Sequence, residues 1–205
     1  MEGKKAVLVP DSTYHIYNRA NGRERLFYNE GNYRYFLRLF EQRLGSLVDV
    51  YCYCLMPNHF HFLLRVKEAR DIEEAIFRLK FNSRTLQGFQ TLGGLEKREV
   101  VSKFLTQQFS HLFNAYAQAL NKEQSRKGSL FMHPFKRKLV TDESYLRKLI
   151  HYIHLNPVVA GLVDNPDCWR YSSYGNIILH NYDRMMLEKV IGLFGDMENF
   201  KYCHS

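Results

Sequence analysis

Residues 56–66 read Met-Pro-Asn-His-Phe-His-Phe-Leu-Leu-Arg-Val, a turn followed by an alternating apolar strand. Because successive side chains of a strand point to opposite faces, His59 and His61 project together from one face. The opposite face carries the apolar side chains that a core would receive, Phe60, Phe62 and Leu64. The two imidazoles would stand roughly 7 Å apart at the backbone on a rigid sheet, in a position to hold a metal ion.

The rest of the chain reads as a mixture of hairpins and helices. The expected strands span residues 13–19, 47–54, 59–66 and 137–140, with an apolar run at 5–9 as a further edge strand. The expected helices span residues 32–44, 71–85, 101–120, 143–156 and 184–194. Pro157 disfavours helix at the residue before it, so the fourth helix should end near Asn156. This order lacks regular β-α-β alternation and predicts an α+β fold, an antiparallel sheet with helices packed on one face.

The length of 205 residues fits one large domain with at most a small appendage. We expect residues 1–175 to form that domain and residues 176–205 to add a C-terminal helical extension to it. The composition, 45% apolar and 15% aromatic, suffices for a core and argues against disorder. No stretch approaches the ~20 apolar residues of a membrane span and no signal-peptide run is present, which predicts a cytoplasmic protein without a membrane partner. The four cysteines fit a reducing compartment, and their spacing does not favour a zinc site or a disulfide.

The formal charge of +8 and the pI near 9.3 favour a polyanionic partner. The basic residues cluster at 126–127, 136–138 and 147–148, with aromatic residues between them. A solvated charged face is the simpler explanation of such clusters. Their interleaving with aromatic residues favours a phosphate-binding face.

A second segment supplies the side chains that a metal site at the two histidines would lack. On a helix, Lys148, Tyr152 and Asn156 are four residues apart and form one column on one face. Two histidines and an amide oxygen are enough to hold a divalent ion with positions left for a phosphate. This donor set does not select one metal: Mg²⁺ or Mn²⁺ suits phosphate chemistry, and Zn²⁺ or Ni²⁺ can bind more tightly in vitro.

A tyrosine beside such a metal is a credible nucleophile, although a phenol, with an ordinary pKa of about 10, needs a base or a cation to ionise near neutrality. Its attack on a DNA phosphate would leave a 5′-phosphotyrosyl link and a free 3′-OH, and an incoming 3′-OH can reverse the step. Each feature alone has a simpler explanation: a packed or surface histidine pair, a packing tyrosine, an asparagine that caps a helix. Their combination favours a strand-transfer site.

Two motifs together resemble those of the single-tyrosine HUH transposases, which move insertion sequences as single-stranded DNA. The motifs are Met-Pro-Asn-His-Phe-His-Phe-Leu-Leu at residues 56–64 and Tyr-Ile-His-Leu-Asn-Pro-Val-Val-Ala-Gly-Leu-Val at residues 152–163. Shorter similarities lie at residues 14–19, 128–131, 135–138 and 169–174, so the resemblance covers roughly residues 11–175. The Asn-Pro ending places the chain nearer the REP-associated tyrosine transposases than members with glutamine in the third-ligand position.

The resemblance implies a role for each motif residue. His59 and His61 match the metal ligands, and Asn156 matches the third ligand. Tyr152 matches the nucleophile. The resemblance also implies a ferredoxin- or RRM-like antiparallel sheet with the HUH motif on a central strand, so that residues 1–175 would be the catalytic domain. Family substrates are single strands with hairpins, which a basic face with aromatic side chains suits. The basic residues expected to contact DNA are Arg65, Arg126, Lys127, Lys136, Arg137, Lys138 and Lys148.

These observations predict a transposase, a metal-dependent tyrosine DNA endonuclease and strand transferase. It would cleave and rejoin hairpin-bearing single-stranded DNA through a 5′-phosphotyrosine, with Mg²⁺ or Mn²⁺ as cofactor, and would be nucleoid-associated when bound to DNA. Two alternatives stay open: a domesticated hairpin-DNA-binding protein that no longer cleaves, and a rolling-circle-type initiator nickase, which the short chain makes less fitting. The sequence also leaves open the hairpin, the cleavage site, the physiological metal, and whether the protein is a monomer or a homodimer that exchanges its tyrosine helix.

Overall fold

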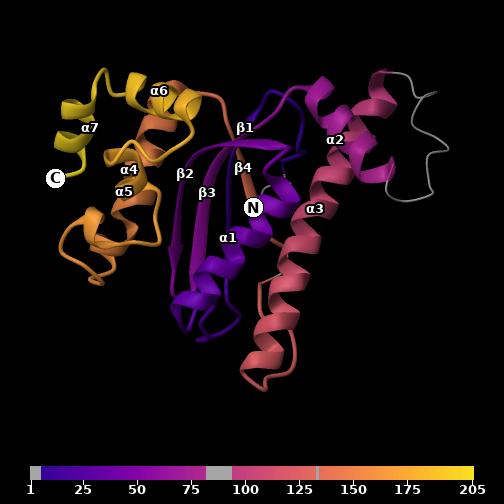
Figure 1. Ribbon diagram of the computed structural model, residues 1–205, viewed down its shortest axis with the longest axis horizontal. Coiled ribbons are helices and arrows are strands. Elements are labelled where there is room, and N and C mark those ends of the chain that lie inside the picture. Colours follow the sequence, from indigo (N-terminus) through magenta and orange to yellow (C-terminus); the bar gives the residue numbers. More distant parts are fainter. Residues whose placement is uncertain (1–5, 82–93, 133) are drawn as a thin grey trace.

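A four-stranded antiparallel sheet forms the centre of the computed structural model, which describes residues 6–81, 94–132 and 134–205 (Figure 1). The strand order is β2-β3-β1-β4, so the strand that carries both histidines lies inside the sheet, as predicted. The strands are β1 (Thr13–Arg19), β2 (Val48–Met56), β3 (His59–Val66) and β4 (Lys136–Val140). β1 and β3 have their predicted bounds, and β2 and β4 differ from theirs only at the ends. The α+β class is confirmed.

The apolar run at residues 5–9 does not form the expected edge strand. Residues 6–9 belong to no strand, residue 5 lies outside the described residues, and β4 takes the place beside β1. The Tyr14 hydroxyl donates to the carbonyl of Val7 at 2.6 Å and accepts from the Val9 amide at 3.0 Å. These bonds satisfy backbone groups that a strand would have paired, while the Leu8 side chain is fully buried.

The helices largely follow the predicted pattern. α1, α3 and α6 correspond to predicted helices, and α3 is longer than predicted at both ends. The predicted helix at 71–85 is α2 as far as residue 81, and its remaining residues lie outside the described ones. α5 and α7 were not predicted, since a helix of five to seven residues is too short to show a periodic pattern. The bounds are α1 (Glu30–Leu44), α2 (Ala69–Phe81), α3 (Gly94–Glu123), α4 (Glu143–Val159), α5 (Tyr174–Ile178), α6 (Arg184–Gly192) and α7 (Met197–Cys203).

The helices cover both faces of the sheet, which corrects the expectation that they pack on one face (Figure 1). α1 and α3 pack on the face formed by Phe60 and Phe62, as the strand alternation predicts. α4 packs on the opposite face, where Leu63 joins Cys52 and Cys54 in a second buried cluster. Because β2 and β3 are apolar on both faces beyond the histidines, both faces need cover from water.

Helix α4 runs through Pro157 and does not end at Asn156, which corrects the predicted boundary. The chain leaves the helix at Gly161, which has a positive φ of 66°. The Gly161 amide donates to the Val158 carbonyl and the Leu162 amide donates to the Pro157 carbonyl, both at 2.9 Å. This Schellman motif satisfies the last carbonyls of the helix. Pro157 lies in the last turn, so its missing N–H removes one helical bond at most, and Gly161 sets the end.

The segment that follows α4 returns to the sheet and packs on the second cluster. The Trp169 indole donates to the Leu55 carbonyl at 3.0 Å, which anchors this segment to β2. Further along, the Tyr182 hydroxyl donates to the Val50 carbonyl at 3.0 Å, and Phe200 is fully buried beside α4. The division of the chain at residue 175 stays a prediction.

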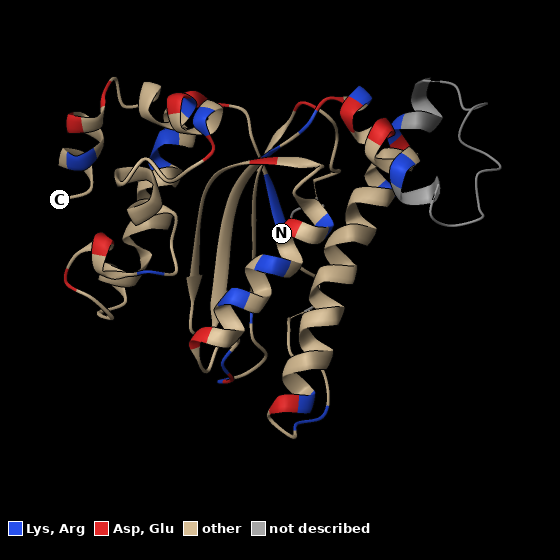
Figure 2. Cartoon of the chain, in the orientation of Figure 1, with Lys and Arg blue, Asp and Glu red and all other residues tan. Residues whose placement is uncertain are grey.

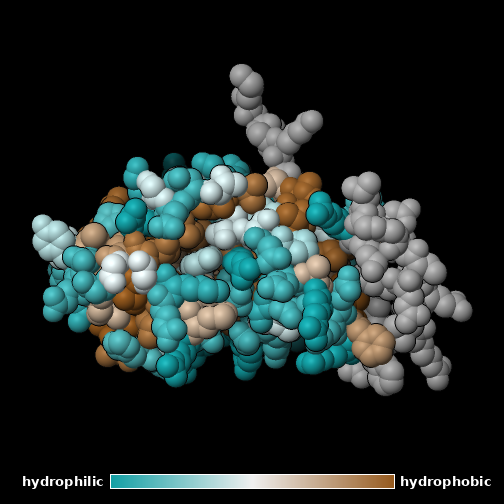
Figure 3. Space-filling view, turned by 90° about the horizontal axis from the view of Figure 1, so that it is seen from above, coloured by the Kyte–Doolittle hydropathy of each residue, from teal (hydrophilic) through white to brown (hydrophobic). Residues whose placement is uncertain are grey.

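Figure 3 shows one face as mostly hydrophilic, with hydrophobic side chains in scattered patches, and in Figure 2 most of β4 is basic. Across the described ranges, no helix is both long and apolar enough to cross a membrane.

Candidate active site

The two histidines of β3 stand on the face that α4 covers. The turn at residues 57–58 starts the strand, and the alternation then sends His59 and His61 to one side and Phe60 to the other. His61 is 6% exposed and His59 is half-buried, with their ring centroids 5.1 Å apart. The predicted pairing of the two imidazoles on one face is confirmed.

Helix α4 brings the predicted nucleophile and third ligand to these histidines within one chain. Oδ1 of Asn156 lies 3.1 Å from Nε2 of His59. The Tyr152 ring meets the His61 ring edge-on, with centroids 5.6 Å apart and planes at 79°. Tyr152 is 50% exposed, so its hydroxyl-bearing side chain is open to a ligand. Residues nearly a hundred positions apart in the sequence therefore form one cluster.

The tyrosine helix is fixed from its buried side. Between Tyr152 and Asn156, His154 points into the protein and is fully buried. Its Nε2 lies 2.9 Å from the Ser173 hydroxyl, and its Nδ1 lies 3.2 Å from Nε2 of His204. Burial lowers the pKa of His154 well below its ordinary value, and nearby histidines add to the shift. His154 is thus a packing and anchoring residue, which holds the register of the helix against the sheet.

Each metal-ligand candidate has its second ring nitrogen engaged. Nδ1 of His59 lies 2.7 Å from Oδ1 of Asn58, and Nδ1 of His61 lies 2.9 Å from Nε2 of His15. A histidine that binds metal through one nitrogen usually donates from the other, which fixes the tautomer and the ring orientation. Nε2 is therefore the atom through which each histidine would bind a metal, and in His59 that atom faces Oδ1 of Asn156.

His15 was missed by sequence reasoning. It lies on β1, opposite Leu63 in the antiparallel register, and so faces the same side of the sheet as His61. The alternation of residues 13–19 indicates which side chains of this strand lie on the same face as His15. The pairing of β1 with β3, which joins segments about fifty residues apart, was not available from the pattern.

The donor set fits a divalent ion without selecting one metal. In an octahedral site with bond lengths of about 2.1 Å, neighbouring ligands stand about 3.0 Å apart, and the distance between Nε2 of His59 and Oδ1 of Asn156 is 3.1 Å. Two imidazoles with one amide oxygen would leave further positions for water or phosphate oxygens. Among the described residues, no group of three or more His, Cys, Asp or Glu side chains could hold a metal. The site therefore depends on Asn156.

The electrostatics keep the histidines neutral. Burial lowers the pKa of His61 to about 3, with smaller contributions from His15 and His59. Burial and the Lys138 charge lower the pKa of His15 to about 4. Burial also lowers the pKa of His59, although its bond to Asn156 opposes that shift. Neutral imidazole is the form that binds metal.

Two further residues of β1 lie on the histidine face and were also missed. Tyr17 pairs with His61 across the strands, and Arg19 pairs with His59. The Tyr17 ring stacks on His61 with centroids 5.8 Å apart, and on His15 at 4.7 Å. The Tyr17 ring thus forms an aromatic surface beside the histidines.

Three of the predicted DNA-binding residues lie around this face. Lys136 and Lys138 pair with Tyr17 and His15 in the β1–β4 register and share their side of the sheet. Lys148 lies on the exposed column of α4 that contains the tyrosine. These lysines border the candidate site with positive charge.

The other predicted DNA-binding residues are placed differently. Arg65 pairs with Asp11 at 2.6 Å, and Arg126 forms an ion pair with Glu24. Arg137 points to the α3 side, where it donates to Thr106 at 2.9 Å and burial lowers its pKa. Lys127 is exposed in the loop after α3. Their contact with DNA stays a prediction.

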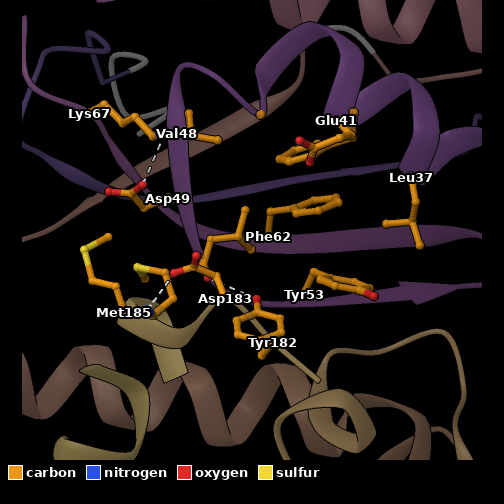
Figure 4. A pocket seen from close by; sticks show the side chains of 14 residues that line it. Leu37, Glu41, Val48, Asp49, Tyr53, Phe62, Lys67, Tyr182, Asp183 and Met185 are labelled. Atoms are coloured by element: carbon orange, nitrogen blue, oxygen red, sulfur yellow. Dashed lines mark hydrogen bonds and ion pairs between the residues drawn. The ribbon is translucent and has the colours of Figure 1, made fainter. Parts of the chain in front are cut away.

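A cavity near β2 is separate from this cluster. A cavity of about 570 Å³ lies between α1 and the segment that leads into α6, lined by Phe40, Phe62 and Tyr182 among others (Figure 4). Phe62 faces the α1 side of the sheet, so this cavity and the histidines lie on opposite faces. In the candidate site His61 is buried, whereas Tyr152 is exposed to solvent.

Comparison with known proteins adds an independent observation. Residues 8–91 match the sequence model of a family described as transposase IS200 like. A solved structure of a REP-associated tyrosine transposase bound to a REP hairpin is similar in fold, with a TM-score of 0.55 and 14% sequence identity, and the similarity covers 90% of each chain. No curated protein matches the chain. These matches agree with the resemblance that the motifs indicate: residues 8–91 are similar to the IS200-like transposase family, and the fold is similar to that of the REP-associated tyrosine transposase.

Proposed function

We propose that this chain cleaves and rejoins hairpin-bearing single-stranded DNA through a covalent intermediate on Tyr152. The observation that carries the proposal is the position of that tyrosine, with its ring 5.6 Å from His61 and one helical turn from Asn156. An exposed phenol beside two neutral imidazoles and an amide oxygen is the arrangement that a metal-assisted tyrosine nucleophile requires.

The proposed chemistry is a reversible phosphoryl transfer. The Tyr152 oxygen forms a bond to the scissile phosphorus, the bond from phosphorus to the 3′ oxygen breaks, and the proton from the phenol passes to solvent while the leaving 3′ oxygen gains one. The product is a 5′-phosphotyrosine and a free 3′-OH, and an incoming 3′-OH reverses the step. His59, His61 and Asn156 would hold Mg²⁺ or Mn²⁺, which when bound polarises the phosphate. The fixed helix α4 holds the nucleophile in place, which reduces the entropic cost of the attack.

The proposed partner is a DNA hairpin with an unpaired strand next to it. The solved structure that is similar in fold contains a REP hairpin. In this chain, Lys136, Lys138 and Lys148 would contact phosphates, and the Tyr17 ring could stack on an unpaired base. All the proposed site residues come from one chain, so a single copy would suffice for cleavage.

The test is a covalent-adduct assay with the purified protein. An oligonucleotide with a hairpin and a single-stranded flank, incubated with Mn²⁺, should give a protein–DNA species that resists denaturation. His61→Ala should abolish it, and an oligonucleotide with a disrupted stem should reduce it strongly. Salt-sensitive hairpin binding without an adduct, across several hairpins and metals, would overturn the proposal in favour of a DNA-binding protein that does not cleave.

A further inference from the structure

Arg19 ends β1 at the edge of the candidate site. In the β1–β3 register it lies directly opposite His59, two residues beyond Tyr17, which lies opposite His61. Residues at this spacing share one face of a strand, so Arg19 stands on the same face as the metal-ligand candidates. The residue is exposed.

The backbone of Arg19 is held on both sides. Its amide donates to Oδ1 of Asn18 at 2.9 Å, and its carbonyl accepts from the Met132 amide at 2.9 Å. The following residue, Ala20, bridges to Phe131. The end of the strand is therefore held by hydrogen bonds, and the Arg19 side chain extends from this fixed backbone position beside His59.

No described carboxylate forms an ion pair with Arg19. Other arginines near the sheet and its helices do have such partners: Arg65 pairs with Asp11, Arg126 with Glu24, and Arg170 with Glu30. An arginine with an acidic partner offers little charge to a ligand. Arg19 keeps its positive charge for one.

A cation next to metal ligands is unfavourable by itself, because two positive charges repel. The Arg19 charge already contributes to the lowered pKa of His59. The arrangement becomes favourable when an anion lies between the guanidinium and the metal site. A phosphodiester supplies that anion, and the planar guanidinium matches two phosphate oxygens.

We propose that Arg19 is a further catalytic residue, whose guanidinium binds a non-bridging oxygen of the scissile phosphate. It neutralises the charge that builds on the phosphate as the tyrosine attacks, and takes no part in bond making or proton transfer. This role rests on the proposed function, because it needs the phosphate to lie between α4 and the end of β1.

The test compares Mn²⁺ affinity with and without DNA in a Tyr152→Phe background, where no cleavage can occur. Without DNA, Arg19→Gln should bind Mn²⁺ as tightly as the parent or more tightly, because one repulsive charge is gone. With a hairpin oligonucleotide bound, Arg19→Gln should bind Mn²⁺ at least about tenfold more weakly than the parent, because the phosphate is no longer held at the site. With DNA bound, the Mn²⁺ affinity of Arg19→Lys should lie between that of Arg19→Gln and that of the parent.

The matched control is Arg38→Gln, an exposed arginine of α1 on the opposite face of the sheet, which should match the parent in both states. In the cleavage-competent protein, Arg19→Gln should slow adduct formation by a factor on the order of 10². A weaker Mn²⁺ affinity of Arg19→Gln without DNA would point to a structural role and overturn the proposal, as would unchanged affinities in both states. If the protein with Tyr152 and Arg19 intact forms no adduct, the proposed cleavage is refuted, whereas the Mn²⁺–DNA comparison in the Tyr152→Phe background still tests Arg19.

Discussion

The imidazole of His15 lies with its Nε2 atom 2.9 Å from Nδ1 of His61, so a histidine of β1 holds a ligand candidate of β3. We expect His15→Leu to weaken Mn²⁺ binding by about 10–100-fold, the usual effect of removing such a partner. His15→Gln keeps an acceptor oxygen for the His61 N–H and should recover much of that loss. Isothermal titration with Mn²⁺ measures both, and a His15→Leu protein that binds Mn²⁺ like the wild type would show that this contact does not orient His61.

The His15 contact also illustrates what the sequence could predict about the site. The strand with both histidines was predicted at its observed bounds, because a turn at residues 57–58 precedes it and histidine alternates with phenylalanine at its start. Tyr152 and Asn156 were predicted because their helical spacing is local. His15, Tyr17 and Arg19 were missed because their relation to the histidines depends on strand pairing, which no local pattern records.

The errors in the fold have physical causes of the same kind. Helices on one face were expected, but Leu63 and Cys54 make the histidine face apolar as well, and that face needed α4 as a cover. Pro157 by itself predicts that α4 ends at Asn156, but the helix ends about one turn later, at Gly161, whose positive φ allows the Schellman motif.

The salt dependence of hairpin binding should report which basic residues meet phosphates. Lys136 and Lys138 flank the histidine face without a described acidic partner, so replacing both by Gln should lower the slope of log affinity against log salt by about 1.5–2. Arg65→Gln is the control, since Arg65 is paired with Asp11 and should change the slope little. Fluorescence anisotropy between low and moderate salt measures the slopes. An equal loss of slope in the control would contradict this division of the basic residues.

The stability of the protein should fall in mildly acidic solution. Burial lowers the pKa of His204 to about 4, and its Nδ1 lies 2.7 Å from the Phe200 carbonyl. As the pH falls below the ordinary histidine pKa of about 6.5, His204 becomes protonated in the unfolded chain. In the folded protein it stays neutral until the pH reaches about 4. Stability is therefore lost across that window, by up to about 1.4 kcal/mol per pH unit for each such histidine.

Urea unfolding at pH 7.5, 6 and 5 tests this expectation. In His204→Gln the number of protons taken up on unfolding should fall by about one, so the free energy of unfolding should depend less on pH. The variant should also be less stable than the wild type at neutral pH. His180→Gln is the control, because His180 lies in an exposed turn. A pH dependence that is the same for the wild type and His204→Gln would contradict the assignment.

Mixing two inactive variants tests whether the site works within one chain. His61→Ala lacks a metal ligand and Tyr152→Phe lacks the nucleophile, so a mixture regains activity only if chains exchange the tyrosine helix. Because α4 meets β3 of its own chain, we expect no adduct in the mixture. Adduct formation in the mixture, to a substantial fraction of the wild-type level, would show exchange between subunits.

The central claim is that Tyr152 is the nucleophile, and the most direct measurement is the identity of the residue that becomes linked to DNA. The protein is incubated with the hairpin oligonucleotide and Mn²⁺, digested with protease and nuclease, and its peptides are analysed by mass spectrometry. We predict a nucleotide phosphate on the peptide that contains Tyr152, no adduct with Tyr152→Phe, and an adduct with Tyr17→Phe, the other tyrosine beside His61. A modified peptide that contains Tyr17 in place of Tyr152, or an undiminished adduct with Tyr152→Phe, would contradict the account.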